Sequence, residues 1–211
     1  MSRLLYISAS PRGEFSASIQ AARIFLDALP EGVSVEHIDL CRRKLPEVTL
    51  EITAAKMKAF AGMPLTPEEA RQWAAIVELV DEFKAADHYL MAVPMWNFNV
   101  PYRFKQYIDL LTHPGLTFTR DEHGPRGLVS GGVTLIYSRG GDYSPKGGKP
   151  DPFDFQSPYL RAWLRLIGLG PADEVYVQGT MAGPDGVANS VAGATVELQA
   201  LAAGLVPGPD V

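Results

Sequence analysis

The alternation of short apolar runs with longer amphipathic segments constrains the fold of this 211-residue chain more than any other feature. The apolar runs have the length of buried strands and lie at residues 4–7, 33–38, 89–93, 133–137 and 175–177. Strands that alternate with helices are typical of βαβ units, which build parallel sheets. We therefore predict an α/β fold with a doubly wound, five-stranded parallel sheet and helices on both faces.

Hydrophobic residues recur at helical spacing in four segments, namely 22–29, 104–111, 159–167 and 185–205. The stretch of roughly fifty residues between the second and third strands is too long for a plain loop. Within it, Thr66 and Glu69 have the spacing of a capping box and Pro67 takes the first helical position, which predicts a helix that ends near Lys84. The chain has no internal repeat and no linker, so we expect residues 1–211 to form a single domain.

Composition and charge exclude several classes of function. A net charge of -5 with a charged fraction of 20% disfavours binding to the phosphate backbone of nucleic acid. No segment approaches the ~20 apolar residues that span a bilayer, and the N-terminus lacks the hydrophobic region of a signal peptide. The single cysteine, Cys41, excludes intramolecular disulfides and thiolate-rich metal sites, and the histidines lack the spacing of a metal pair. We expect a cytoplasmic protein without membrane span, metal or nucleic acid partner.

Residues 8–18 form the first candidate binding loop, because they lead from the first strand into the first helix and contain four serines. In a doubly wound sheet, ligands bind beyond the carboxyl ends of the strands, where free amides at a helix N-terminus attract phosphate. Ser16 and Ser18 can add hydroxyl donors. The glycine patterns of dinucleotide and nucleoside-triphosphate sites are absent, so a phosphate monoester fits better. The alternative is that Ser16 is only a helix cap in a solvated turn.

Residues 94–101 form a second loop, which holds two prolines, two asparagines and two aromatic residues. Prolines at both ends stiffen the backbone. A stiff loop that offers amides and flat apolar side chains suits a planar heteroaromatic ring, and flavin is the obvious candidate. The alternative is that Trp96 and Phe98 fill a gap in the core beneath a tight turn.

Residues 138–143 form a third loop, after the fourth strand. Gly140 and Gly141 allow the backbone to approach a ligand closely. Arg139 has the charge to offset negative charge that develops on a reduced flavin. The alternative is an ordinary surface turn with a solvated arginine.

These loops closely resemble those of the FMN-dependent NADH-azoreductase family, whose members also act as quinone reductases. The matching segments are 10–12 with Ser16 and Ser18, 94–99, 104–110, 115–118, 124–128 and 138–141. The resemblance covers essentially the whole chain. It implies a flavodoxin-like fold, bound FMN, NADH or NADPH as the electron donor, a quinone or azo acceptor, and a homodimer with both active sites at the subunit interface.

The resemblance also assigns the residues that bind the cofactor. Four of them would hold the phosphate end, namely Ser10, Ser16, Ala17 and Ser18. Eight would frame the flavin ring, namely Met95, Trp96, Asn97, Phe98, Ser138, Arg139, Gly140 and Gly141. Trp96 stands where family members commonly carry tyrosine, and the segment 142–155 is expected to border the acceptor pocket.

We expect ping-pong transfer of two electrons, with no catalytic acid or base, because the cofactor carries the chemistry. One alternative is a flavodoxin-like electron carrier without a substrate pocket. The insertion before the third strand argues against a carrier, since Phe60 and Trp73 could cover the flavin and build a dimer face, although such residues are more often plain core. A hydrolase is a second alternative, but the chain lacks the G-x-S-x-G motif.

Overall fold

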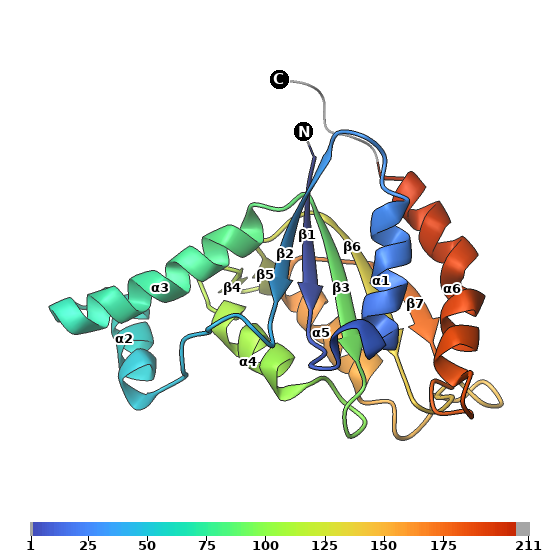
Figure 1. The fold of residues 1–211 in the computed structure, drawn as a ribbon. Helices are drawn as coiled ribbons and strands as arrows, with labels where there is room; N and C mark the ends of the chain where they lie inside the picture. Colours follow the sequence, from blue (N-terminus) through green and yellow to red (C-terminus); the bar gives the residue numbers. More distant parts are fainter. Residues whose placement is uncertain (1, 206–211) are drawn as a thin grey trace.

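The centre of the molecule is a parallel sheet of five strands in the order β2-β1-β3-β6-β7 (Figure 1). The computed structural model describes residues 2–205. The five strands are β1 (Ser2–Ser8), β2 (Val33–Asp39), β3 (His88–Pro94), β6 (Gly132–Ser138) and β7 (Asp173–Val177). Every neighbouring pair is parallel, so the sheet predicted from the sequence is confirmed.

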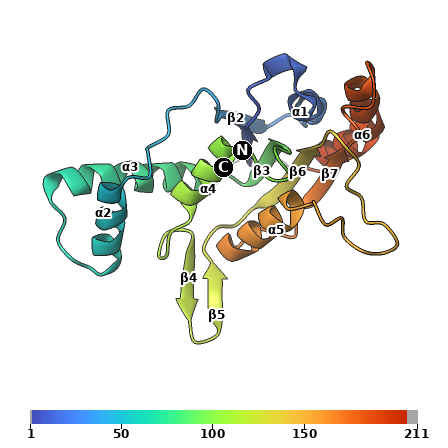
Figure 2. The same cartoon turned by 90° about the horizontal axis from the view of Figure 1, so that it is seen from below.

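Helices cover both faces of this sheet, as Figure 2 shows from below. The pattern of β1 explains why, because its side chains alternate between two buried cores. Leu4 and Tyr6 pack into a core with helices α1 and α6, and Leu5 and Ile7 pack into a larger core with α3, α4 and α5. The helices are α1 (Ala17–Asp27), α3 (Pro67–Lys84), α4 (Tyr102–Leu111), α5 (Gln156–Ile167) and α6 (Gly186–Ala203).

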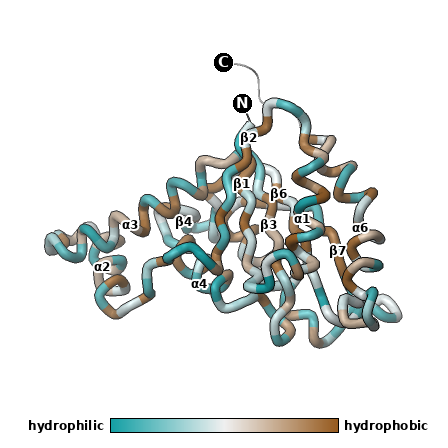
Figure 3. The backbone as a smooth tube through the Cα atoms, viewed as in Figure 1, coloured by the Kyte–Doolittle hydropathy of each residue, from teal (hydrophilic) through white to brown (hydrophobic). Residues whose placement is uncertain are grey.

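The insertion between β2 and β3 forms an arm of two helices that extends past the sheet (Figures 1 and 2). The predicted capping box of α3 is present, because Thr66 Oγ1 accepts from the Glu69 amide and the Glu69 carboxylate accepts from the Thr66 amide at 2.9 Å. The second helix, α2 (Leu50–Phe60), was not predicted. Only Ile52 and Ala55 of α2 are buried, so its pattern in the sequence is weak. In Figure 3, α3 alternates between hydrophilic and hydrophobic residues, which fits a helix with one buried side.

A hairpin of β4 (Phe118–Asp121) and β5 (Gly124–Gly127) is the other element that the sequence did not predict, together with a short 3-10 helix, η1 (Gly13–Phe15). Both strands of the hairpin are short, and β5 begins and ends with glycine. Long-range contacts hold the hairpin, because the Val129 amide donates to the Ile167 carbonyl at 2.9 Å. A Cβ on Gly127 would lie 2.0 Å from the Gly168 nitrogen, so only glycine permits this approach of the hairpin to the end of α5.

Parallel strands place their carboxyl ends at one edge of the sheet, at the bottom of Figure 1. The three loops singled out from the sequence follow β1, β3 and β6, which are neighbours in the sheet. The fold therefore brings them to the same edge. Within residues 2–205, no helix has the length and apolar character needed to cross a membrane.

Candidate functional site

The candidate site lies at the topological switch point of the sheet. The chain leaves β1 for the edge strand β2 and then returns to β3 on the other side of β1. In doubly wound sheets a crevice opens at this point beyond the strand ends. The second and third loops meet there directly, since the Met95 amide donates to the Ser138 carbonyl at 2.8 Å.

The first loop buries its hydroxyls around the start of α1. Ser10, Ser16, Ala17 and Ser18 are each at most 6% exposed. Ser16 occupies the N-cap position of α1, but its side chain makes no capping hydrogen bond and instead contacts Ser18 Oγ at 3.0 Å. The interpretation of Ser16 as only a helix cap is therefore wrong. An uncapped helix N-terminus next to two hydroxyls has the donors and the dipole that a phosphate monoester requires.

The second loop contains a strained turn. Trp96 and Asn99 exchange two backbone hydrogen bonds, of 2.8 and 3.0 Å, and the two residues between them have left-handed backbones, with φ of 46° at Asn97 and 71° at Phe98. Asparagine tolerates this conformation, but phenylalanine adopts it rarely, and such strain concentrates at functional sites. Trp96 is 37% and Phe98 43% exposed, so the alternative in which they fill a core gap is wrong.

Phe98 belongs to an aromatic wall, which we define as Phe98, Tyr143 and Phe153. The ring centroid of Phe98 lies 5.1 Å from that of Phe153 and 6.4 Å from that of Tyr143. The Phe155 amide also donates to the Phe98 carbonyl at 3.2 Å. The segment 142–155 is thus held against the second loop, and half-exposed rings stand at the edge of the crevice.

The third loop is fixed by the chain that follows β7. The carbonyls of Arg139 and Gly140 accept from the amides of Thr180 and Met181, at 3.1 and 3.2 Å. A Cβ on Gly140 would lie 2.8 Å from the sulfur of Met181. A side chain at this position would displace Met181, and the close approach of the backbone to a ligand stays a prediction.

The side chain of Arg139 does not behave as the sequence suggested. It is 1% exposed and pairs with Asp154 at 3.1 Å, while its other nitrogens donate to Gln156 and Gln178. A buried guanidinium that is already paired with a carboxylate is neither a solvated arginine nor a free charge for a reduced ring. Asp154, Gln156 and Gln178 were missed because nothing in their local sequence distinguishes them from surface polar residues.

The histidine and cysteine side chains considered in the sequence analysis do not form a catalytic site. His37 Nε2 lies 2.9 Å from Ser8 Oγ, but Ser8 is 1% exposed and cannot meet a substrate as a nucleophile, which weighs against the hydrolase. Burial and the Asp39 carboxylate raise the pKa of Cys41, so this thiol is not activated. Within residues 2–205, no cluster of three or more His, Cys, Asp or Glu side chains is arranged to hold a metal ion.

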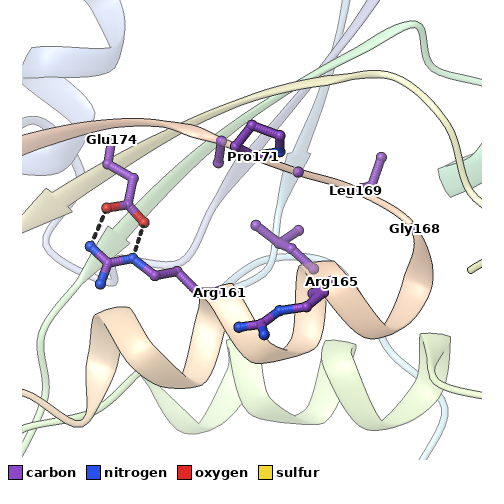
Figure 4. A pocket seen from close by; sticks show the side chains of 9 residues that line it. Arg161, Arg165, Gly168, Leu169, Pro171 and Glu174 are labelled. Atoms are coloured by element: carbon purple, nitrogen blue, oxygen red, sulfur yellow. Dashed lines mark hydrogen bonds and ion pairs between the residues drawn. The ribbon is translucent and has the colours of Figure 1, made fainter. Parts of the chain in front are cut away.

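Some cavities of the molecule lie at the three loops of the candidate site, and others lie away from them. One of about 520 Å³ adjoins the second loop and is lined by Trp96, Asn97, Asn99, Val100, Tyr102, Lys105 and Tyr159. Another of about 520 Å³ lies between α5 and the start of β7 (Figure 4), where Arg161 is paired with Glu174 and Arg165 stands beside apolar residues. The first belongs to the candidate site. The second is at the amino end of β7, away from the three loops.

The fold and the crevice define a flavodoxin-like protein with a ligand site at its switch point. The model of a family described as a flavodoxin-like fold matches residues 2–202. The chain is 43% identical over 190 residues to an FMN-dependent NADH:quinone oxidoreductase of Nitratidesulfovibrio vulgaris (strain DP4), covering 88% of this chain and 90% of that protein. It is 41% identical to the enzyme of that name from Desulfotalea psychrophila, covering 95% of each.

Solved structures agree with these relatives. A crystal structure of an azoreductase from Bacillus anthracis (strain Sterne) has a TM-score of 0.86 and 27% identity, covering 97% of this chain and all (100%) of that one. A crystal structure of an FMN-dependent NADH-azoreductase from B. anthracis (Ames Ancestor) in complex with FMN has a TM-score of 0.82 and 26% identity, covering 96% and 100%. The chain therefore belongs to the flavodoxin-like family of FMN-dependent NADH:quinone oxidoreductases and NADH-azoreductases.

Proposed function

We propose that this protein is an FMN-dependent oxidoreductase that uses NADH or NADPH to reduce quinones and azo compounds. The observation that carries the proposal is the meeting of three loops at the switch point, where an uncapped helix N-terminus with buried hydroxyls faces the same edge as a strained aromatic turn. The names of the relatives support the choice of FMN, NADH and quinone, and the names of the neighbouring structures support azo compounds.

In this proposal the first loop binds the phosphate end of FMN through Ser10, Ser16, Ala17 and Ser18. Residues 95–98 and 138–141 contact the flavin ring, with the backbone of Arg139 rather than its buried guanidinium at the ring. The residues fit, because buried hydroxyls, free helix amides and a glycine pair suit a phosphate and a flat ring. Bound FMN would supply two-electron redox chemistry that the side chains lack.

The turnover that we propose is ping-pong, with the nicotinamide and the acceptor using one crevice in turn. No side chain is assigned a catalytic acid or base role. The chain positions the two aromatic partners and keeps water away from them. The aromatic wall and the cavity of about 520 Å³ beside Trp96 provide apolar surface for this task. These features also favour an enzyme over an electron carrier, which needs no pocket for a second ring.

The proposal includes a homodimer with active sites at the subunit interface, a single domain over residues 1–211 and a cytoplasmic location. Exposed apolar residues on the α2–α3 arm support the dimer, while Trp73 is partly buried against the core. The single cysteine supports a reducing compartment.

The visible spectrum of the protein reconstituted with FMN, recorded without oxygen, tests this function. We expect FMN to be retained, its absorbance to be bleached by NADH and then restored by a benzoquinone. The same titration with NADPH reports the preferred donor. Failure to retain FMN would refute the proposal, and retention without bleaching by either nucleotide would favour the electron carrier.

A further inference from the structure

Arg139 is the largest of the fully buried side chains, and aromatic rings and hydrogen-bond acceptors surround its guanidinium. Its guanidinium lies beside a stacked pair of tyrosine rings, 5.1 Å from the centroid of Tyr137 and 4.8 Å from that of Tyr176. One terminal nitrogen reaches both oxygens of Asp154, at 3.1 and 3.2 Å. Its three nitrogens donate to three different residues, namely Gln156, Gln178 and Asp154, and the single ammonium of lysine does not provide such a fork of donors.

The groups that accept from Arg139 are themselves fixed to other parts of the crevice. Gln156, which accepts from Nε at 3.1 Å, donates to the carbonyl of Val93 at the end of β3. Gln178 accepts from the Tyr143 amide at 2.9 Å and donates to Ser144 Oγ at 2.8 Å. The Arg139 guanidinium is therefore connected to the end of β3, where the second loop begins, to the third loop, and to both ends of the segment 142–155.

Asp154 completes the connection at the far end of that segment. Its carboxylate accepts from the Ser157 amide at 3.0 Å, at the first turn of α5, and from the Ser157 hydroxyl. Phe153 and Phe155 flank Asp154 in the chain. Phe153 is in the aromatic wall and the Phe155 amide is bonded to Phe98, so the position of Asp154 determines where these rings stand.

We propose that Arg139 is a positioning residue that sets the aromatic wall, and hence the fit of the nicotinamide and the acceptor, through its buried pair with Asp154. This inference rests on the proposed function and extends it. Arg139 acts through the segment 142–155 and not through its charge on the flavin, because Asp154 already balances that charge and both groups are largely buried. The wall is thereby a specificity element that a buried cation, 5.9 Å from the ring centroid of Tyr143, holds in place.

The test compares Arg139→Met, Arg139→Lys and Asp154→Asn in the FMN-loaded protein, with Arg3→Met as the matched control on a half-exposed ion pair with Glu36. Hydrogen exchange measures the amides of Tyr143 and Phe155, which are bonded to Gln178 and Phe98. We expect these amides to exchange ~10-fold faster in the three variants, because local opening governs exchange. KM for a benzoquinone should rise ~10-fold with a smaller change in kcat, since the variants displace a binding surface.

The lysine variant and the flavin midpoint potential separate positioning from charge. If the charge acted on the ring, Arg139→Lys would keep the wild-type potential and KM, and Arg139→Met would shift the potential. We expect the opposite, with both variants raising KM and neither moving the potential. Wild-type exchange at Tyr143 and Phe155 in Arg139→Met and Asp154→Asn would overturn the inference.

Should Arg139→Met not fold because Asp154 is left alone, the pair Arg139→Met with Asp154→Leu removes both charges and is expected to fold. It should still show fast exchange and a raised KM. If the wild-type protein does not retain FMN, the proposed function fails, but the exchange measurement on the unloaded protein still decides whether Arg139 holds the wall.

Discussion

His113 is a buried histidine that weakens the protein in acid. It is 4% exposed, and neither ring nitrogen has a hydrogen-bond partner among the described residues. Burial and then the neighbouring Lys56 lower the pKa of His113 to about 4. In the unfolded chain His113 takes up a proton below its ordinary pKa of ~6.5, whereas in the folded chain it stays neutral until about pH 4. Stability is therefore lost as the pH falls through this window.

We predict that His113→Phe stabilises the protein and flattens its pH dependence. The gain in unfolding free energy over wild type should grow by ~3 kcal/mol between pH 7 and pH 4, at ~1.4 kcal/mol for each unit of pKa difference. The new ring can keep the edge contact with Trp73, whose centroid lies 5.3 Å away. Urea unfolding across that pH range measures the difference. His123→Gln, at an exposed position, is the control, and a difference independent of pH would contradict the assignment.

At the residue scale, the sequence identified the loops but not the roles within them. Ser16 and Ser18 were recognisable because serines between a strand and a helix point to an anion. The burial of Arg139 was not recognisable, because its partners Asp154 and Gln178 come from distant segments that only the folded sheet brings together. The left-handed backbone at Phe98 was hidden for a related reason, since the sequence gives no sign of a strained phenylalanine.

At the element scale, local signals decided which elements could be predicted. The start of α3 was visible because a capping box and a proline lie within four residues of one another. The helix α2 and the β4–β5 hairpin were not visible, because their stability depends on contacts with α3 and α5 rather than on their own patterns.

We predict that Thr66→Ala destabilises the arm by ~1 kcal/mol, the usual cost of losing a helix cap, whereas Thr66→Ser is neutral. The Thr66 hydroxyl accepts from the Glu69 amide at 3.3 Å, and Glu69 also accepts from Lys58 of α2 at 2.6 Å. Hydrogen exchange along α3, compared with that in β3, measures the loss locally. Equal protection of α3 in the alanine and serine variants would show that the cap adds nothing.

Glu69→Gln separates the cap from the ion pair, because glutamine can still accept from the Thr66 amide but carries no charge for Lys58. The pair is partly exposed, with side chains 35% and 16% accessible, so its loss should cost less than ~1 kcal/mol.

At the scale of the whole molecule, α2 leaves an apolar surface exposed. Leu50, Met57 and Phe60 lie on one side of α2 and are 80%, 61% and 66% exposed, while Ile52 and Ala55 are buried on the other side. A helix with apolar residues on both sides is expected to bury the outer side as well. The sequence suggested Phe60 for such a role because it lies in the insertion before the third strand. The outer stripe itself became visible only once α2 was located.

We predict that Phe60→Glu converts a homodimer into monomers, because a charge in an apolar interface costs desolvation that no partner offsets. Sedimentation equilibrium should give twice the mass of one chain for wild type and the mass of one chain for the variant. Val196→Glu, at a 78% exposed position on α6, is the matched control and should remain dimeric. If the active sites lie at the interface, Phe60→Glu should also lower the affinity for FMN, although Phe60 is far along the chain from the three loops. A monomeric variant with wild-type FMN affinity would show that the dimer does not complete the site.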